Sequence, residues 1–336
     1  MSLDYLVQLC QSGIYQSDTR QQRLLADKAK KYIKEHAISF SSMRHNGNVV
    51  SSNHPMFEAC RVGYMHLVKE LLDCGASLNV TDEEGRSPLY AAISSHRNQL
   101  DNIMKLLQWG ANVNLYKYNR VPLLCAFYGM DSQVTKLLIH HGADVNNVNL
   151  PSFCFIESLF ALNSGMVMMA AGVRFHFENF EELLSLGTEI VLAGLAPRTV
   201  YLSGRSFLTI NFTDKVMSDL WAFQQLCLVL GFRVDLFCLQ EAINELCISL
   251  KTSIDNQQVD ILKQRLEKFD WIKQFQMQPL PLTYITRIAL RSYLSSPKIS
   301  RGRHVGQVID ELPLPVLARD FLAMRYQHSE EVAVQS

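Results

Sequence analysis

The 336-residue sequence lacks an excess of either charge, because 32 Lys and Arg residues balance 32 Asp and Glu residues. Without a strongly basic surface, the chain is not expected to bind nucleic acid through the phosphate backbone. It also lacks any CxxC pair among its eight cysteines, which are scattered from Cys10 to Cys247. This usage predicts reduced, buried thiols of an intracellular protein and no disulfide framework.

Long apolar runs and known catalytic motifs are also missing. The longest charge-free apolar stretch, between Glu157 and Arg174, falls short of the roughly 20 residues that a membrane-spanning helix needs. The first residues show no signal peptide. No GxGxxG, phosphate-binding loop, HExxH or GxSxG occurs, and His140-His141 has no further ligand at metal-binding spacing. We therefore expect a soluble, non-catalytic protein without cofactor or metal, in the cytoplasm and also in the nucleus.

A repeat occupies the middle of the chain. The segments 71–79, 106–114 and 137–146 share a Leu-Leu pair followed by Gly-Ala and a later Asn, and Met168–Val173 is a weaker copy. The glycines Gly75, Gly110 and Gly142 recur at intervals of 35 and 32 residues. Each glycine comes where a helix should end in a left-handed residue, which glycine adopts at little cost.

The repeats also begin alike. Ser87-Pro88 offers an N-cap followed by proline at the first helical position, and Val121-Pro122 and His54-Pro55 stand at the same point of their repeats. With a period near 33 residues, the segment 51–178 resembles the ankyrin-repeat family. The resemblance implies an all-α solenoid of helix pairs with short β-hairpin loops.

The segments around these repeats are predicted to be helical as well. Residues 1–50 form an N-terminal helical segment, and apolar stripes in 237–277 predict two helices that cap the solenoid. Between them, 179–236 is either a degenerate repeat or a helical insertion. In that segment Gly187 and Gly231 each follow an apolar run that resembles a repeat end.

The segment 279–326 has two parts. Pro281–Leu294 predicts an amphipathic helix with Leu282, Ile285, Ala289 and Tyr293 on one face, and Leu290 and Leu294 beside them. The run Leu312-Pro313-Leu314-Pro315 cannot lie inside a helix or a central strand, so it predicts an extended turn with leucines outward. A short helix through Leu317, Phe321 and Leu322 should follow.

Together the two parts resemble the SOCS box, a C-terminal helical module. Pro281, Leu282, Ile285, Arg287, Leu290 and Arg291 match its elongin-binding box, although Thr286 stands at the usual cysteine position. Its hydroxyl can bond back to the Leu282 carbonyl. The resemblance implies that elongin C, paired with elongin B, contacts Leu282, Ile285, Thr286, Ala289 and Leu290. It implies that cullin-5, which carries a RING subunit, contacts Ile309, Leu312, Pro313, Leu314, Pro315 and Phe321.

The loops between ankyrin helices are the expected place for a protein target. Tyrosine and arginine are favoured at protein interfaces. The loop residues considered for target binding are Asp82, Glu83, Arg86, Tyr116, Tyr118 and Arg120.

Placed after ankyrin repeats, a SOCS box resembles the ankyrin-repeat and SOCS-box family. That family implies a substrate-recognition adaptor of an elongin B/C–cullin-5 ubiquitin ligase, which binds a target through the repeats. Two alternatives stay open: an ankyrin scaffold without a ligase role, and an enzyme with an unrecognised site in 173–236.

Overall fold

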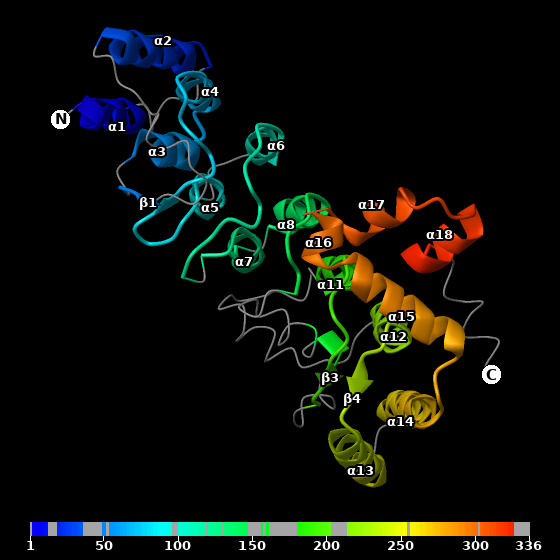
Figure 1. Ribbon diagram of the computed structural model, residues 1–336. Coiled ribbons are helices and arrows are strands. Elements are labelled where there is room, and N and C mark those ends of the chain that lie inside the picture. Colours follow the sequence, from blue (N-terminus) through cyan, green and yellow to red (C-terminus); the bar gives the residue numbers. More distant parts are fainter. Residues whose placement is uncertain are drawn as a thin grey trace. The chain divides into compact units, whose positions relative to one another are not determined.

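A computed structural model describes residues 2–12, 19–35, 49–51, 54–95, 100–118, 120–129, 131–146, 156, 159–160, 180–202, 214–253, 256–301 and 303–325. The chain divides into two compact units, Met1–Asp144 and Val145–Ser336. Figure 1 shows that both consist mainly of helices.

The first unit is a stack of helix pairs. Its elements are α1 (Ser2–Ser12), α2 (Thr19–Glu35), β1 (Val49–Val50), α3 (Pro55–Val62), α4 (Met65–Asp73), β2 (Thr81–Asp82), α5 (Pro88–Ser94), α6 (Leu100–Gln108), α7 (Pro122–Tyr128) and α8 (Ser132–His140). Helices α1, α3, α5 and α7 pack in sequence, while α2 packs on α4 and α6 on α8 (Figure 1). The N-terminal helices α1 and α2 therefore pack on the first ankyrin-like helix pair, α3 and α4, and add one more pair to the stack.

The predicted helix starts are confirmed. The side chains of His54 and Ser87 accept hydrogen bonds from backbone N–H groups in the first turns of α3 and α5, at 3.1 and 3.2 Å. Proline follows at the first helical position in α3, α5 and α7. These caps satisfy N–H groups that a helix leaves without partners.

The predicted helix ends are confirmed as well. Gly75, Gly110 and Gly142 all have φ between 82° and 91°. Each donates its N–H to the carbonyl three residues earlier, and the next residue donates to the carbonyl five residues earlier, the hydrogen-bond pattern of a glycine-ended helix. The asparagine after each end joins successive repeats. The Asn79 side chain donates to the Gly110 carbonyl at 3.0 Å and accepts from the Asn112 N–H at 2.8 Å.

The expected β-hairpin is present as a turn in the loop at 82–86, where Asp82 donates its N–H to the Arg86 carbonyl at 2.9 Å and Gly85 donates to the Asp82 carbonyl at 3.0 Å, but the strand pairing differs from that of a hairpin. The strands that the structure describes pair in parallel, β1 with β2, so that Val49 lies opposite Thr81 and Val50 opposite Asp82. A hairpin would pair neighbouring strands of one loop antiparallel. Here the pairing joins two loops that lead into successive helix pairs.

The second unit contains α11 (Phe180–Leu192), β3 (Thr199–Val200), α12 (Asp214–Val229), β4 (Arg233–Val234), α13 (Leu236–Thr252), α14 (Asn256–Met277), α15 (Leu282–Leu294), α16 (Pro297–Ser300), α17 (Val305–Asp310) and α18 (Val316–Ala323). Two further ankyrin-like helix ends occur here. Gly194 and Gly231 have φ of 110° and 93°, and β3 pairs in parallel with β4. The Asn146 side chain donates to the Gly194 carbonyl at 2.8 Å, as Asn79 does to Gly110.

The two predictions for glycines in this region had different outcomes. The repeat end at Gly231 has the expected geometry, because Gly231 donates to Leu228 and Phe232 to Cys227. The end predicted at Gly187 is wrong, since Gly187 lies inside α11. An added Cβ there would meet Leu159 at 2.7 Å and Phe223 at 3.1 Å, so this glycine permits close packing. The weaker copy Met168–Val173 lies outside the described residues.

The two helices predicted in 237–277 are α13 and α14, which pack against each other (Figure 1). Leu239, Ile243 and Leu246 of α13 are buried, as are Leu262 and Phe269 of α14. Among the described residues, no helix combines the length and the apolar character needed to cross a bilayer.

Candidate protein-docking surfaces

Helix α15 exposes one apolar face, which we call the α15 outer face. The helix begins at Leu282, directly after Pro281, whose carbonyl accepts a hydrogen bond from the Tyr284 N–H at 2.9 Å. Leu282 is 77% exposed, the largest exposed fraction among the described large apolar side chains. Residues three, four, seven and eight positions apart share a helix face. The outer face consists of Leu282, Ile285, Thr286, Ala289, Leu290 and Tyr293, all of them exposed.

Thr286 makes the backbone bond that the sequence predicted. Its hydroxyl donates to the Leu282 carbonyl at 2.8 Å. The hydroxyl is therefore satisfied within the helix, which lowers the cost of covering it by another protein. Leu294 departs from the expected stripe, because it is buried with the opposite face of the helix.

The opposite face of α15 buries two arginines. Arg287 is only 1% exposed and lies between the rings of Tyr284 and Phe321, with its guanidinium carbon 4.8 and 4.3 Å from their centroids. Arg291 donates to the Leu322 carbonyl at 2.8 Å and also to the Leu192 carbonyl. Burial, with a smaller contribution from Arg287, lowers the pKa of Arg291 to about 10. These contacts attach the inner face of α15 to α18 and to the end of α11.

The Leu312–Pro315 run forms the link between α17 and α18. It is not helical, as predicted, and α18 follows at Val316. Pro313, Leu314 and Pro315 are exposed. Val316 and Leu317 are also exposed, by 60% and 68%, and sequence reasoning missed them as site residues. We call Pro313–Leu317 the link surface.

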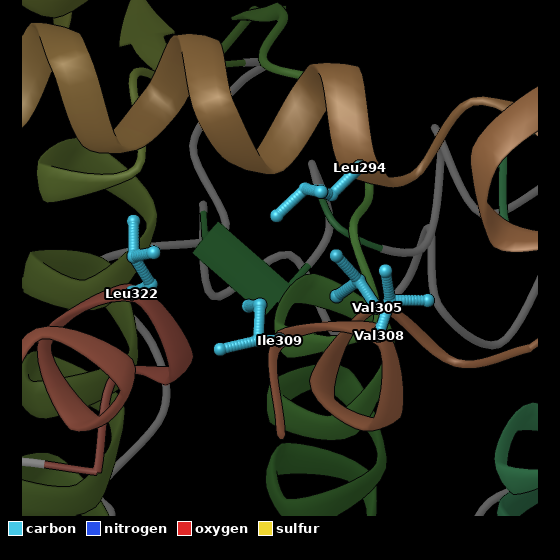
Figure 2. Close-up of a cluster of buried hydrophobic side chains, with 5 residues drawn as sticks. All are labelled: Leu294, Val305, Val308, Ile309 and Leu322. Carbon is cyan, nitrogen blue, oxygen red and sulfur yellow. The ribbon is translucent and has the colours of Figure 1, made fainter. Parts of the chain in front are cut away.

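Three residues that the sequence grouped with this link point inward instead. Ile309 is fully buried in a cluster with Leu294, Val305, Val308 and Leu322, which Figure 2 shows. Leu312 and Phe321 pack against the same cluster and are half-buried. Apolar burial of this kind stabilises the link from inside. These three side chains therefore support the link surface more than they form it.

Ion pairs surround the base of the link. Arg325 pairs with Asp310 at 2.7 Å and with Asp320 at 3.5 Å. Arg319 donates to the Asp310 carbonyl at 3.0 Å, and Arg303 pairs with Glu311. Exposed pairs contribute little individually. The contacts of Arg319 and Arg325 with Asp310 join the end of α17 to α18.

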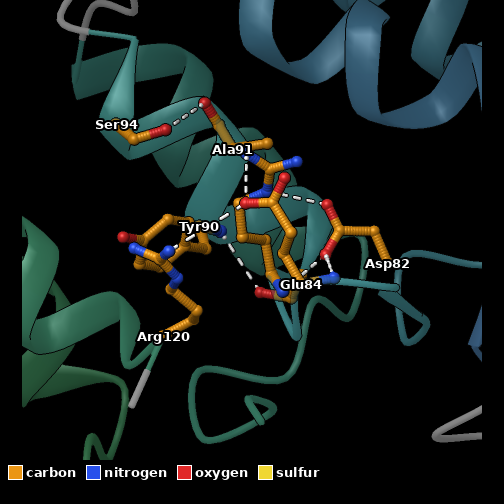
Figure 3. Close-up of polar contacts among 8 residues, drawn as sticks. Asp82, Glu84, Tyr90, Ala91, Ser94 and Arg120 are labelled. Carbon is orange, nitrogen blue, oxygen red and sulfur yellow. Dashed lines mark hydrogen bonds and ion pairs between the residues drawn. The ribbon is translucent and has the colours of Figure 1, made fainter. Parts of the chain in front are cut away.

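The loop residues considered for target binding fall into two kinds. Asp82 is buried, and its carboxylate accepts from the backbone of Glu84 and Arg86 at 3.0 and 2.8 Å and from the Arg86 side chain at 2.7 Å. Figure 3 shows this polar cluster, which also includes Tyr90 and Arg120. Asp82 and Arg86 therefore organise their own loop. Glu83 is exposed.

The second loop presents an aromatic side chain to solvent. Tyr118 is 76% exposed and has φ of 48°, an uncommon value for a residue other than glycine. Tyr116 is half-buried, and burial raises its pKa. Arg120 lies 3.9 Å from Glu84 and bonds to Tyr90. Of the two tyrosines considered for target binding, Tyr118 thus has the more accessible side chain.

Comparisons with known proteins identify the repeats. Residues 56–149 match the family model described as ankyrin repeats (3 copies). Human transient receptor potential cation channel subfamily A member 1 is 39% identical over 71 residues, which are 20% of this chain and 6% of that protein. Ankyrin repeat and SOCS box protein 5 of Oryctolagus cuniculus is 34% identical over 95 residues, 28% of this chain and 28% of that protein.

A third relative also matches over only part of its length. Ankyrin repeat, SAM and basic leucine zipper domain-containing protein 1 of Chlorocebus aethiops is 35% identical over 94 residues, 26% of this chain and 19% of that protein. The chain thus spans less than a third of the length of each of these relatives. Residues 56–149 are ankyrin repeats, a module through which proteins bind other proteins.

Proposed function

We propose that this protein is a substrate-recognition adaptor of an elongin B/C–cullin-5 ubiquitin ligase. The observation that carries the proposal is the α15 outer face, where Leu282 is 77% exposed while Arg287 and Arg291 are buried behind it. A contiguous exposed apolar face is a common mark of a protein-interaction site. The partial relationship to an ankyrin repeat and SOCS box protein supports the same assignment.

The α15 outer face is the proposed elongin C site. Leu282, at the helix start, is exposed enough to insert into a pocket of a partner. Burying one leucine side chain contributes about 1.5–3 kcal/mol, so Leu282 should dominate the binding energy. Ile285, Thr286, Ala289 and Leu290 would surround it, and Tyr293 extends the contact at the end of the helix.

The link surface is the proposed cullin-5 site. Pro313 and Pro315 restrict the backbone before binding, which reduces the conformational entropy lost when a partner binds. Leu314 would then be the central contact, with Val316 and Leu317 beside it. Ile309, Leu312 and Phe321 act from inside by holding this link in shape.

The ankyrin repeats would hold the target protein, with Tyr118 as the preferred contact. The chain itself supplies no reacting group in this proposal. A target held by the repeats meets the ubiquitin that the cullin-bound RING subunit delivers, at a local concentration set by the complex. The alternative is an ankyrin scaffold whose partners do not include a ligase.

Affinity purification from cells separates the two. The tagged wild-type chain should co-purify with elongin B, elongin C and cullin-5. Leu282→Asp should lose all three, because a charge replaces the central apolar contact of α15. Leu314→Asp should retain the elongins and lose most of the cullin. A wild-type chain that purifies without elongins, or a Leu282→Asp chain with unchanged partners, would leave the scaffold as the function.

A further inference from the structure

Arg287 lies at the contact between α15, which carries the outer face, and α18, which carries part of the link surface. Its α15 neighbours Leu282, Ile285 and Leu290 face outward, while its own side chain is buried. The guanidinium stacks between Tyr284, which belongs to α15, and Phe321, which belongs to α18. A cation between two aromatic faces attracts both, and more strongly when water is excluded.

The same region contains polar contacts to the end of α18. Arg287 donates to the Phe321 carbonyl at 3.5 Å, and Arg291 donates to the Leu322 carbonyl at 2.8 Å. The last carbonyls of a helix have no partners within the helix and carry partial negative charge. Two guanidinium groups of α15 therefore bind the C-terminal end of α18.

This attachment determines how the link surface is held. Val316 and Leu317 begin α18, and Phe321 lies only one turn after Leu317. Because a single short helix joins them, an anchor at Phe321 fixes the direction in which Val316 and Leu317 point. The α15 outer face has no such dependence, since its side chains leave the helix on the opposite side.

We infer that Arg287 is a positioning residue that orients the cullin-binding link surface through Phe321 without contacting either partner. This inference rests on the proposed function and adds a specific role to it. It also reassigns Phe321 from a cullin contact to the second half of the Arg287 anchor.

A double-mutant cycle on the purified full-length chain tests the inference. Arg287→Leu, Phe321→Leu and the double variant are compared with the wild type for binding to the elongin B–C pair and then to cullin-5 with its RING subunit. Each single variant should weaken cullin binding about tenfold, and the double variant by no more than either alone, because both remove one interaction. Elongin binding should change less than about twofold.

Two further variants make the result specific. Lys298→Leu removes an exposed cation of α16 and should leave both affinities unchanged. Arg287→Lys keeps a cation near the rings and should recover part of the cullin binding. Simple misfolding of the tail would instead weaken elongin and cullin binding together, and that outcome overturns the inference.

Failure of the inference differs from failure of the proposed function. A wild-type chain that binds both partners, together with an Arg287→Leu chain that binds cullin normally, overturns the inference alone. Additive losses in the double variant also overturn it, because they would make Phe321 a direct contact. A wild-type chain that binds neither partner overturns both proposals.

Discussion

Helices α6 and α15 place their apolar and charged side chains in opposite ways. Helix α6 buries Ile103, Leu106 and Leu107 and exposes Asp101 and Lys105, as a helix of a folded core should. Helix α15 exposes leucines and an isoleucine and buries two arginines. Packing inside the chain accounts for the apolar face of α6, whereas no described residue covers the apolar face of α15, which is the face that the proposed function assigns to another protein.

The largest expected effect is a difference in the free energy of unfolding between leucine substitutions in the two helices. Leu106→Ala in α6 should lower the free energy of unfolding by about 2–5 kcal/mol, because it leaves a cavity in a fully buried site. Leu282→Ala in α15 should change it by less than about 0.5 kcal/mol. Urea denaturation followed by circular dichroism measures both. Equal losses would mean that Leu282 already packs within the chain.

The stability of the first unit, which contains α6, should depend on pH through a buried histidine. Burial lowers the pKa of His54, the cap of α3, from 6.5 to about 4. The unfolded chain therefore binds this proton first as the pH falls. The stabilisation is complete above pH 6.5 and is lost as the pH falls through 4, with an expected magnitude of about 3 kcal/mol.

The matched variant for this titration is His54→Asn, which retains a side-chain acceptor for the Met56 N–H and does not titrate. Its free energy of unfolding, measured in urea from pH 7 to pH 4, should fall less steeply than that of the wild type. Parallel pH profiles would show that His54 does not control the acid stability of the repeats.

Glycine substitutions compare a packing site with a helix end. Gly187→Ala in α11 should lower the free energy of unfolding by about 1–3 kcal/mol, because its Cβ would meet Leu159 and the ring of Phe223. Gly110→Ala meets no atom within 4 Å but has φ of 88°, which should cost about 1 kcal/mol. A stabilised Gly187→Ala chain, measured by thermal denaturation, would contradict the close packing of α11.

The smallest expected effect concerns Thr286. Thr286→Cys should strengthen elongin binding about threefold, because a thiol costs less to bury than a hydroxyl, even one that is bonded to Leu282. Thr286→Val, which has the same shape and no hydroxyl, should act in the same direction. Competition binding against the wild type is sensitive enough to measure this, and weaker binding by both variants would contradict it.

The features that local patterns encode could be predicted from the sequence. The helix ends at Gly75, Gly110 and Gly142 and the cap at Ser87 depend on residues only a few positions apart. Gly194 was missed because Ile190-Val191 stands where the other repeats have a Leu-Leu pair, and its φ of 110° together with the long-range bond from Asn146 identifies it. Gly187 was misread because a mid-helix glycine and a helix-ending glycine both follow apolar residues.

The tail illustrates the same limit. Periodicity predicted α15 as a helix with one apolar face, because a helix face is a local property. The SOCS-box resemblance, and not the periodicity, implied that Leu282 faces a partner. Burial of Arg287, Ile309 and Phe321 depends on contacts across the fold, 34 residues apart for Arg287 and Phe321. The sequence therefore indicated the outer face, but it assigned Ile309 and Phe321 to the link surface, which these two side chains support from inside.

Isothermal titration calorimetry of the purified chain with the elongin B–C pair tests the central claim most directly. The wild type and Ile248→Asp, which changes an exposed apolar side chain of α13 in the same way, should bind equally, with a negative heat-capacity change from apolar burial. Leu282→Asp should bind at least about 100-fold more weakly while its thermal unfolding stays unchanged. Equal affinity of Leu282→Asp and Ile248→Asp, or no binding by the wild type, would contradict the account.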